Sequence, residues 1–527
     1  MRAVIGVDYG TRAARAVLVD SRNGEVLCSH SVAYPHGVLE GDLADAGDYE
    51  SVLLKLLEAI STSQYRDQVA GICVDATSLT LVPLAADGRV LCQIPQFADR
   101  IQAQIKLWKR HAAQPQADEA LRLARAMREP FLGRTGGSVS SEWTLPKLME
   151  MADEDPEAFE ALDLALDLCE FLTCRLTGKL ARSVGSMSFK GLWSRDLGFP
   201  SAGYLNGLRP GLSEKYRHVM RGEALRPGDP AGSLHPQLCR WFGFPLDAVV
   251  AAGTLDGHTS LAALGGLQAG DATLVVGTSN ALTIQTGELC EMEGICGIAM
   301  DGLTAGLYGI DSGQNCTGDM LDWFMRNSVP QEMLAQAQKA NKTPHQLLAE
   351  RVERPWTNCV TALDWWNGSR NAPCDLDLRG MLAGLSLDTR PQDIYLALLQ
   401  GIACGTREIV ELWERNGVTV NRVLATGGIA LKNALLMQEY ANLLNRTVMV
   451  GRIAEGPAMG AAVFAAVAAG IYPNAAEACA EMGVKDFIRY SPDEVHRQAY
   501  EDLYRRNHAL RQMAIGEINW PRRVKSG

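Results

Sequence analysis

Two short turns that combine glycine with threonine constrain the fold of this chain more than any other feature. The first, Asp8-Tyr9-Gly10-Thr11, follows the apolar run 3–7, and the second, Gly277-Thr278-Ser279-Asn280, follows the run 274–276. A strand that ends in a glycine turn brings backbone N–H groups and a hydroxyl close to a bound anion, because no side chain stands in the way. One such turn in each half predicts two lobes that hold one polyphosphate.

The order of elements around the first turn repeats around the second. Residues 3–33 are typical of three strands with a hairpin at Asn23-Gly24, and an amphipathic segment and a buried strand follow before Asp75. From Ala272 the order strand, glycine turn, strand begins again. This weak internal repeat predicts a duplicated α/β architecture. The expected elements are strands at 3–7, 14–19, 28–33, 69–74, 272–276, 281–286 and 307–310, and helices at 48–60 and 492–513.

The length of 527 residues predicts two large domains. We expect an N-terminal domain at 1–265, a C-terminal domain at 266–475 and a helical extension at 476–527. The net charge is −11 and the basic residues are scattered, which argues against a nucleic-acid or anionic-membrane partner. A homodimer is compatible with the sequence.

The 13 cysteines include no C-x-x-C pair and lie mostly in apolar runs, so we expect reduced thiols in a cytoplasmic protein. The N-terminus enters a strand without the pattern of a signal peptide. The most membrane-like segment, 456–471, consists mainly of alanine and glycine and is too short to span a bilayer. It predicts a tightly packed internal helix.

Two carboxylates stand at expected strand ends. Asp8 adjoins the first turn, where it either holds Mg²⁺ for a bound nucleotide or stabilises the turn. Asp256 follows the apolar run 249–252, and it either accepts a proton from an attacking hydroxyl or caps the helix that begins near His258. Arg15 either reaches a phosphate or flanks its strand.

A third glycine turn, Thr426-Gly427-Gly428, precedes a segment that contains Asn433. Its glycines would let an adenine ring approach the backbone, although a tight turn from strand to helix also uses glycine. The P-loop pattern, the dinucleotide fingerprint, a local zinc site and the G-x-S-x-G elbow do not occur in the sequence.

Several longer motifs resemble those of the FGGY carbohydrate kinases and, within that family, the ribulokinases. They include Leu363-Asp364-Trp365-Trp366-Asn367-Gly368 and Asp377-Leu378-Arg379-Gly380-Met381. The remaining motifs lie at 107–113, 136–143, 189–193, 405–407 and 426–438. The likeness therefore extends over nearly the whole chain.

The resemblance implies an α/β, two-domain, actin-like (ribonuclease H-like) ATPase fold with a duplicated mixed sheet and an interdomain cleft. It implies ATP and Mg²⁺ as cofactors and a small-molecule sugar as substrate. Asp256 is the implied catalytic base. The implied sugar contacts are Ser78, Lys190, Asp256 and Asp311. The implied ATP contacts are Gly10, Thr11, Arg15, Gly277, Thr278, Ser279, Gly427, Gly428 and Asn433, with Asp8 as the metal ligand.

Three positions depart from the family pattern. Ala13 stands where the first phosphate motif is expected to have serine, and Asp311 is one methylene shorter than the glutamate usual in ribulokinases. Arg110 stands where the subfamily often has aspartate or histidine. These departures bear on the identity of the sugar rather than on phosphoryl transfer.

The expected reaction is ATP-dependent phosphorylation of a ketopentose, with ribulose to ribulose 5-phosphate as the leading case. Kinases for xylulose, another pentulose or a polyol are alternatives of the same class. An actin-like or chaperone-like ATPase and an inactive sugar-binding regulator are alternatives of different classes. Lys190, Trp143 and Asp311 argue against a pure ATPase, because such a machine has no need of a sugar pocket.

Overall fold

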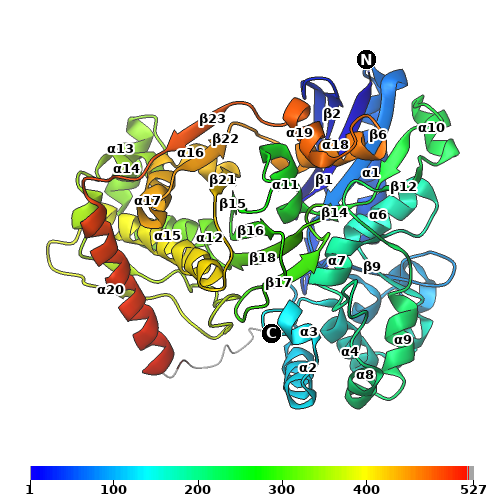
Figure 1. Cartoon of the computed structure of the whole chain (residues 1–527), viewed down its shortest axis with the longest axis horizontal. Coiled ribbons are helices and arrows are strands. Elements are labelled where there is room, and N and C mark those ends of the chain that lie inside the picture. Colours follow the sequence, from blue (N-terminus) through cyan, green and yellow to red (C-terminus); the bar gives the residue numbers. More distant parts are fainter. Residues whose placement is uncertain (1, 519, 521–527) are drawn as a thin grey trace.

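The computed structural model describes residues 2–518 and 520, and two mixed β-sheets form its framework (Figure 1). The first sheet has the strand order β12-β13-β6-β1-β2-β3, with β14 also paired to β6. Its strands are β1 (Ala3–Tyr9), β2 (Ala13–Asp20), β3 (Val26–Ala33), β6 (Val69–Ala76), β12 (Pro230–Ser233), β13 (Val249–Ala251) and β14 (Thr254–Leu255).

The second sheet repeats the pattern of the first. Its order is β17-β18-β16-β15-β21-β22-β23. In both sheets an antiparallel meander, β1-β2-β3 or β15-β16-β18, continues into two parallel strands and then into an antiparallel edge strand. The prediction of a duplicated mixed sheet is therefore confirmed. The strands are β15 (Asp271–Val276), β16 (Asn280–Thr286), β17 (Gly297–Met300), β18 (Tyr308–Gln314), β21 (Arg422–Thr426), β22 (Val448–Gly451) and β23 (Phe487–Tyr490).

The central strand β1 is buried along its whole length because helices cover both faces of the first sheet. One face packs against α1 (Ala46–Ser61), and the other packs against α18 (Gly456–Ala468). A Cβ at Gly6 would overlap the carbonyl oxygen of Ala458, so glycine is required where β1 meets α18. The internal helix expected at 456–471 is confirmed, and no helix among residues 2–518 is both long and apolar enough to cross a membrane.

Helix α18 belongs to the C-terminal half of the chain yet covers a sheet of the N-terminal half. It also packs against α11 (Asp256–Leu264), which leads through residues 265–270 into β15 (Figure 1). These two helices join the two sheets, and the C-terminal half supplies a helix that covers the sheet of the N-terminal half.

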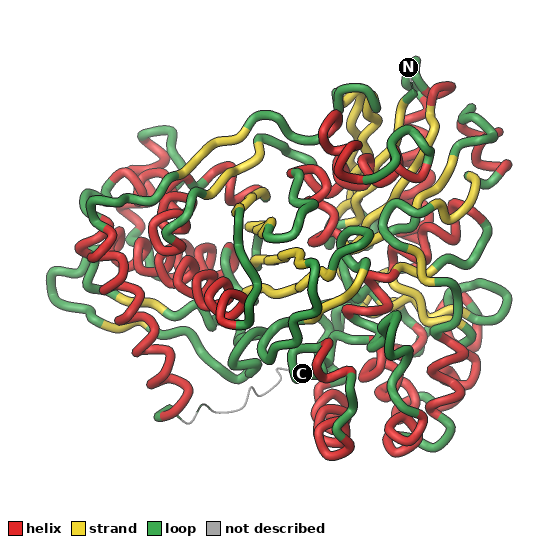
Figure 2. The backbone as a smooth tube through the Cα atoms, viewed as in Figure 1, coloured by secondary structure: helices red, strands yellow, loops and turns green. Residues whose placement is uncertain are grey.

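The other elements surround this framework, and helices lie on the outside of both sheets (Figure 2). A third sheet, β4-β5-β8-β7-β9, was not anticipated from the sequence. The remaining strands are β4 (Val38–Leu39), β5 (Leu43–Ala44), β7 (Leu81–Leu84), β8 (Ile105–Lys106), β9 (Leu164–Asp167), β10 (Arg182–Ser183), β11 (Ala224–Leu225), β19 (Thr361–Ala362) and β20 (Leu382–Ala383). The remaining helices are α2 (Gln114–Met127), α3 (Phe131–Arg134), α4 (Thr144–Glu154), α5 (Pro156–Ala161), α6 (Leu168–Thr177), α7 (Val184–Phe189), α8 (Ala202–Leu208), α9 (Leu212–Val219), α10 (Pro236–Phe242), α12 (Gly318–Asn327), α13 (Gln331–Lys339), α14 (Pro344–Glu350), α15 (Pro391–Arg415), α16 (Gly428–Lys432), α17 (Ala434–Leu444), α19 (Ala475–Met482) and α20 (Arg497–Gly516).

The segment expected as a helical extension also contains a strand, because β23 forms the edge of the second sheet. The last helix, α20, begins at Arg497 instead of Pro492. It is not only a surface helix, since one of its faces buries Leu503, Leu510 and Arg511. Polar side chains on this face therefore contact the interior of the C-terminal half.

Candidate active site

The first glycine turn joins β1 to β2 directly. The N–H of Gly10 donates to the carbonyl of Ala13 at 3.1 Å, and the strand register places Asp8 opposite Arg15. Arg15 forms ion pairs with Asp8 (Nη1 to Oδ2, 3.3 Å) and with Glu455 just before α18 (Nε to Oε2, 3.4 Å). The turn is therefore connected to both halves of the chain.

The second glycine turn lies against the N-terminus of α12. The N–H groups of Thr317 and Gly318 donate to the carbonyls of Thr278 and Gly277 at 2.8 and 3.1 Å. Asn280, the last residue of the turn, donates from Nδ2 to Gln314 Oε1 at 2.9 Å. A glycine turn beside a helix N-terminus is suited to phosphate binding.

The third glycine turn adjoins the second because β15 and β21 are neighbouring parallel strands. Gly427 has φ +106°, and a Cβ there would overlap the carbonyl oxygen of Val276, immediately before Gly277. Asn433 donates from Nδ2 to the hydroxyl of Tyr395 at 2.9 Å, and its Oδ1 caps α17. The structure thus places the candidate phosphate and adenosine turns on one sheet edge.

Asp256 is the first residue of α11, with Leu255 in the cap position, so the side chain does not cap a helix that begins near His258. Its carboxylate accepts hydrogen bonds from the backbone N–H groups of Gly257, at 2.6 Å, and of Ser78. Burial and the nearby charge of Asp8 raise the pKa of Asp256 to about 7. A carboxylate that titrates near neutral pH is suited to act as a general base.

A third carboxylate, Asp75, lies with Asp8 and Asp256 at the ends of neighbouring strands. Asp75 is paired with Asp8 in the parallel register of β1 and β6. Its pKa lies well above the usual range because the carboxyl group is fully buried and faces the charges of Asp8 and Asp256. Sequence reasoning gave Asp75 no role, although it ends its strand just as Asp8 does.

Three neighbouring carboxyl groups are an oxygen donor set of the kind that binds a divalent cation. Burial also raises the pKa of Asp8, although Arg15 pairs with it and acts in the opposite direction. The residues present therefore fit Mg²⁺.

Two of the sugar-binding candidates, Lys190 and Asp311, form a second charged group together with His258 of α11. Lys190, at the end of α7, donates from Nζ to Asp311 Oδ2 at 3.2 Å, and His258 Nε2 lies 3.6 Å from Asp311 Oδ1. Burial alone would raise the pKa of Asp311, but Lys190 and His258 hold it well below its usual range. Asp311 is therefore a charged acceptor held between two donors. His258, which follows Asp256 on α11, was not identified as a site residue from sequence.

Ser78 lies on the turn between β6 and β7, and its Oγ is buried without a hydrogen-bond partner among the described residues. Thr11 Oγ1 lies 3.4 Å from Trp108 Nε1, which donates to it. Arg110, in contrast, donates to the carbonyl of Gly41 and to Glu150 Oε1, both at 2.9 Å. Its departure from the family pattern therefore belongs to a structural network, whereas Ser78 has a free polar group.

Two family models match the chain, the N-terminal domain of the FGGY family of carbohydrate kinases at residues 3–193 and its C-terminal domain at 272–469. The chain belongs to the FGGY family of carbohydrate kinases. Kinases of this family use ATP. The protein is thus a carbohydrate kinase, and the actin-like two-domain fold expected from the sequence is confirmed.

Curated relatives of this kinase include two ribulokinases. The protein from Shouchella clausii (strain KSM-K16) is 36% identical over 526 residues, covering 95% of this chain and 93% of its own. The protein from Mycolicibacterium smegmatis is 36% identical over 553 residues, covering 99% and 98%. The kinase is therefore ribulokinase-like over nearly its whole length.

Solved structures share the fold at lower sequence identity. The xylulose kinase from Rhodospirillum rubrum has a TM-score of 0.80 at 22% identity and covers 97% of this chain and 99% of its own. The glycerol kinase from Plasmodium falciparum has a TM-score of 0.76 at 17% identity and covers 97% and 98%. At these identities the likeness concerns the fold and not the substrate.

Proposed function

We propose that this kinase transfers the γ-phosphoryl group of Mg-ATP to a terminal hydroxyl of a ketopentose, with O5 of ribulose as the preferred acceptor. The observation that carries the proposal is Asp256, a carboxylate with a pKa of about 7 that lies with Asp8 and Asp75 and begins the helix whose His258 contacts Asp311. The ribulokinase relatives support ribulose as the sugar.

Asp256 acts as the general base. The proton of the attacking hydroxyl moves to the carboxylate as the new P–O bond forms, which contributes about 10²- to 10⁴-fold to the rate. The N–H groups of Gly257 and Ser78 hold the carboxylate in one orientation. Alignment matters because phosphoryl transfer depends on positioning and charge stabilisation.

Asp8 is the proposed metal ligand, with Asp75 and Asp256 beside it. Bound Mg²⁺ supplies positive charge that neutralises the phosphates. Gly10, Thr11 and Arg15 form the first phosphate contact, and Gly277, Thr278 and Ser279 form the second. Arg15 pairs with Asp8 in this structure, so both are held at the first turn. Gly427, Gly428 and Asn433 form the proposed adenosine site.

Ser78, Lys190, Asp256 and Asp311 are the proposed sugar contacts. Lys190 and Asp311 provide a charged donor and a charged acceptor, and these form strong directional hydrogen bonds to hydroxyl groups. Asp311 reaches about one methylene less far than a glutamate would, so a xylulose-type pentulose or a polyol is the alternative substrate.

The test is a coupled ADP-release assay with the four ketopentoses and the common pentitols. We expect release to require a sugar and to be fastest with ribulose. ADP release that does not depend on a sugar would support the alternative from a different class, an actin-like or chaperone-like ATPase. In the same assay Asp256→Asn should lose most turnover while keeping nucleotide affinity, and near-normal turnover of this variant would overturn the assignment of the base.

A further inference from the structure

The backbone of Leu79 adopts a conformation that is unfavourable for leucine. Its φ is +67°, in the left-handed region, where the Cβ of an L-residue is crowded. Among the described residues with positive φ that are not glycine, two are leucines, Leu79 and Leu192. Leu79 directly follows Ser78, and Leu192 lies two positions after Lys190. Each strained leucine is thus next to a proposed sugar contact.

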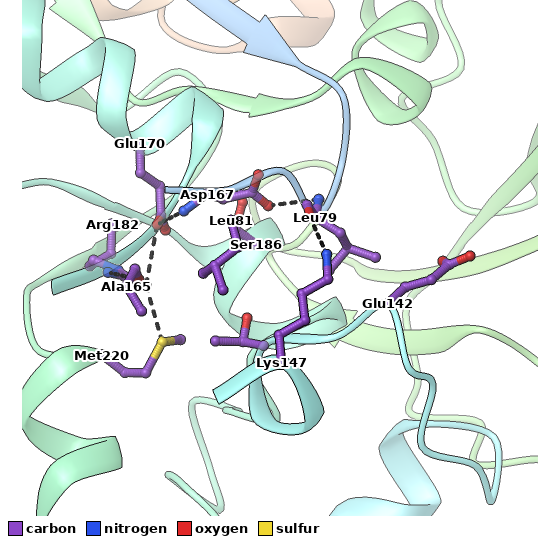
Figure 3. Close-up of a pocket in the computed structure, with 11 residues that line it drawn as sticks. Leu79, Leu81, Glu142, Lys147, Ala165, Asp167, Glu170, Arg182, Ser186 and Met220 are labelled. Carbon is purple, nitrogen blue, oxygen red and sulfur yellow. Dashed lines mark hydrogen bonds and ion pairs between the residues drawn. The ribbon is translucent and has the colours of Figure 1, made fainter. Parts of the chain in front are cut away.

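Two buried side chains that carry ionisable groups form hydrogen bonds with the backbone of Leu79 (Figure 3). Asp167, at the junction of β9 and α6, accepts the N–H of Leu79 with Oδ2 at 3.2 Å. Lys147, on α4, donates from Nζ to the carbonyl oxygen of Leu79 at 2.8 Å. A residue held at both its N–H and its carbonyl cannot relax to negative φ without breaking a charged hydrogen bond.

The same turn carries the hydrogen bond that orients the proposed base. The N–H of Ser78 donates to the carboxylate of Asp256, and the N–H of Thr77 donates to the carbonyl of Tyr9 at 2.9 Å. The direction of the Ser78 N–H depends on the backbone of the turn, and Leu79 is the residue of that turn whose conformation has to be enforced.

Lys147 also connects this turn to the first glycine turn. Its Nζ donates to the carbonyl of Leu107 at 3.2 Å, and the next residue, Trp108, donates from its indole to Thr11 Oγ1. The buried ammonium of Lys147 thus forms hydrogen bonds with two loops. One loop contains Leu79, beside Asp256, and the other contains Leu107, beside the first glycine turn. The cavity between Lys147, Asp167 and their neighbours measures about 10 Å³, so it is too small for a sugar or nucleotide and the two charges act on the backbone.

We propose that Lys147 and Asp167 are positioning residues that hold Leu79 in the left-handed conformation and so aim the Ser78 N–H at the Asp256 carboxylate. We call the pair Lys147 and Asp167 the Leu79 clamp. The proposal rests on the function proposed above, because the clamp orients the base of that reaction. Burial lowers the pKa of Lys147 to about 7 and raises that of Asp167 to about 7, because both side chains lose hydration in the interior.

The first test compares Lys147→Met with Lys106→Met. Lys106 is equally buried, and its ammonium contacts the side chains of Gln102 and Glu150 instead of the carbonyl of Leu79. Its replacement therefore removes a buried ammonium without removing a hydrogen bond to the Leu79 backbone. We expect Lys147→Met to lower kcat about 10- to 100-fold because the base is displaced. The KM for ATP should change far less, because Lys147 reaches one of the three glycine turns, and only through Leu107 and Trp108. Lys106→Met should lower the melting temperature without this loss of kcat. An equal effect of both variants on kcat would refute the clamp.

The second test isolates the backbone conformation. Leu79→Gly and Leu79→Ala both remove the buried side chain, but only glycine adopts positive φ without strain. With Lys147 present their kcat values should agree within about twofold. In the Lys147→Met background the glycine variant should exceed the alanine variant by about fivefold or more. A glycine-to-alanine ratio that is the same in both backgrounds would mean that Lys147 does not hold Leu79.

A readout that needs no turnover separates failure of this proposal from failure of the proposed reaction. Amide hydrogen exchange of residues 77–81 should speed up in Lys147→Met, and in Asp167→Asn if the first variant does not fold, but not in Lys106→Met. Unchanged exchange in an otherwise folded variant would overturn the clamp whatever the reaction is. If exchange is faster in Lys147→Met but the unsubstituted protein phosphorylates no sugar, the clamp is supported and the proposed reaction is rejected.

Discussion

The buried ion pair between Arg511 and Asp364 connects the last helix to the second glycine turn. Arg511 Nη2 lies 2.5 Å from Asp364 Oδ1, and both residues are at most 5% exposed. Asp364 Oδ2 accepts from Gln314 Nε2 at 2.6 Å, and Gln314 Oε1 in turn accepts from Asn280. A chain of buried polar contacts therefore runs from α20 to the proposed phosphate site.

Arg511→Met removes one partner of this pair and leaves the Asp364 carboxylate buried beside a single amide. Breaking a buried pair in this way costs about 3–5 kcal/mol. For a cooperative unit of 150–250 residues, that corresponds to a fall in melting temperature of roughly 6–20 °C. Loss of the charge that orients Asp364 should also loosen Gln314 and Asn280, so we expect the KM for ATP to rise several-fold.

The control is Arg505→Met on the same helix. Arg505 is 68% exposed in its side chain and pairs with Asp502, so its loss should cost no more than about 1 kcal/mol. The double variant Asp364→Asn/Arg511→Met removes both buried charges and should recover at least half of the lost stability. Melting is followed by calorimetry and the KM by ADP release. If Arg511→Met lowers the melting temperature no more than Arg505→Met does, the buried pair does not stabilise the protein as argued here.

Three further outcomes are expected. The proposed base Asp256 has a pKa of about 7 and could act only when deprotonated, so kcat/KM should fall about tenfold per unit as pH drops below 7. A flat pH profile between 5.5 and 7 would contradict this. Lys190→Met should raise the KM for the sugar at least tenfold and leave the KM for ATP unchanged, as two-substrate kinetics would show. Gly6→Ala should destabilise the protein by several kcal/mol in denaturant melts, because its Cβ meets the backbone of Ala458, whereas Gly516→Ala, with open space around it, should be neutral.

The strand framework could be predicted from sequence because each central strand is a continuous apolar run that ends in a distinctive residue. Asp8, Gly277 and Gly427 all follow such runs, and the structure has strand ends at these places. The hairpin at Asn23-Gly24 was also confirmed, since β2 and β3 pair on either side of it. Patterns of this kind are local, so they can be recognised without knowing what packs against them.

Contacts between distant segments could not be predicted in the same way. Lys147 and Arg511 each lie on an amphipathic helix, where a basic residue is normally exposed, but both are buried against groups far away in sequence. The left-handed backbone of Leu79 has no sequence signal, because leucine is not a residue that favours positive φ. These positions depend on the tertiary structure alone.

The duplication of the sheets explains why the two halves carry different chemistry. Equivalent strand pairs, β1 with β6 and β15 with β21, end at equivalent edges of the two sheets. In the first sheet these ends carry the carboxyl groups of Asp8 and Asp75, and in the second they carry the glycines 277 and 427. The proposed metal ligands therefore lie at the edge of the first sheet beside the first glycine turn, and the second and third glycine turns lie at the edge of the second sheet. Asp256, the proposed base, begins the helix that joins the two sheets, and this position occurs once in the duplicated fold.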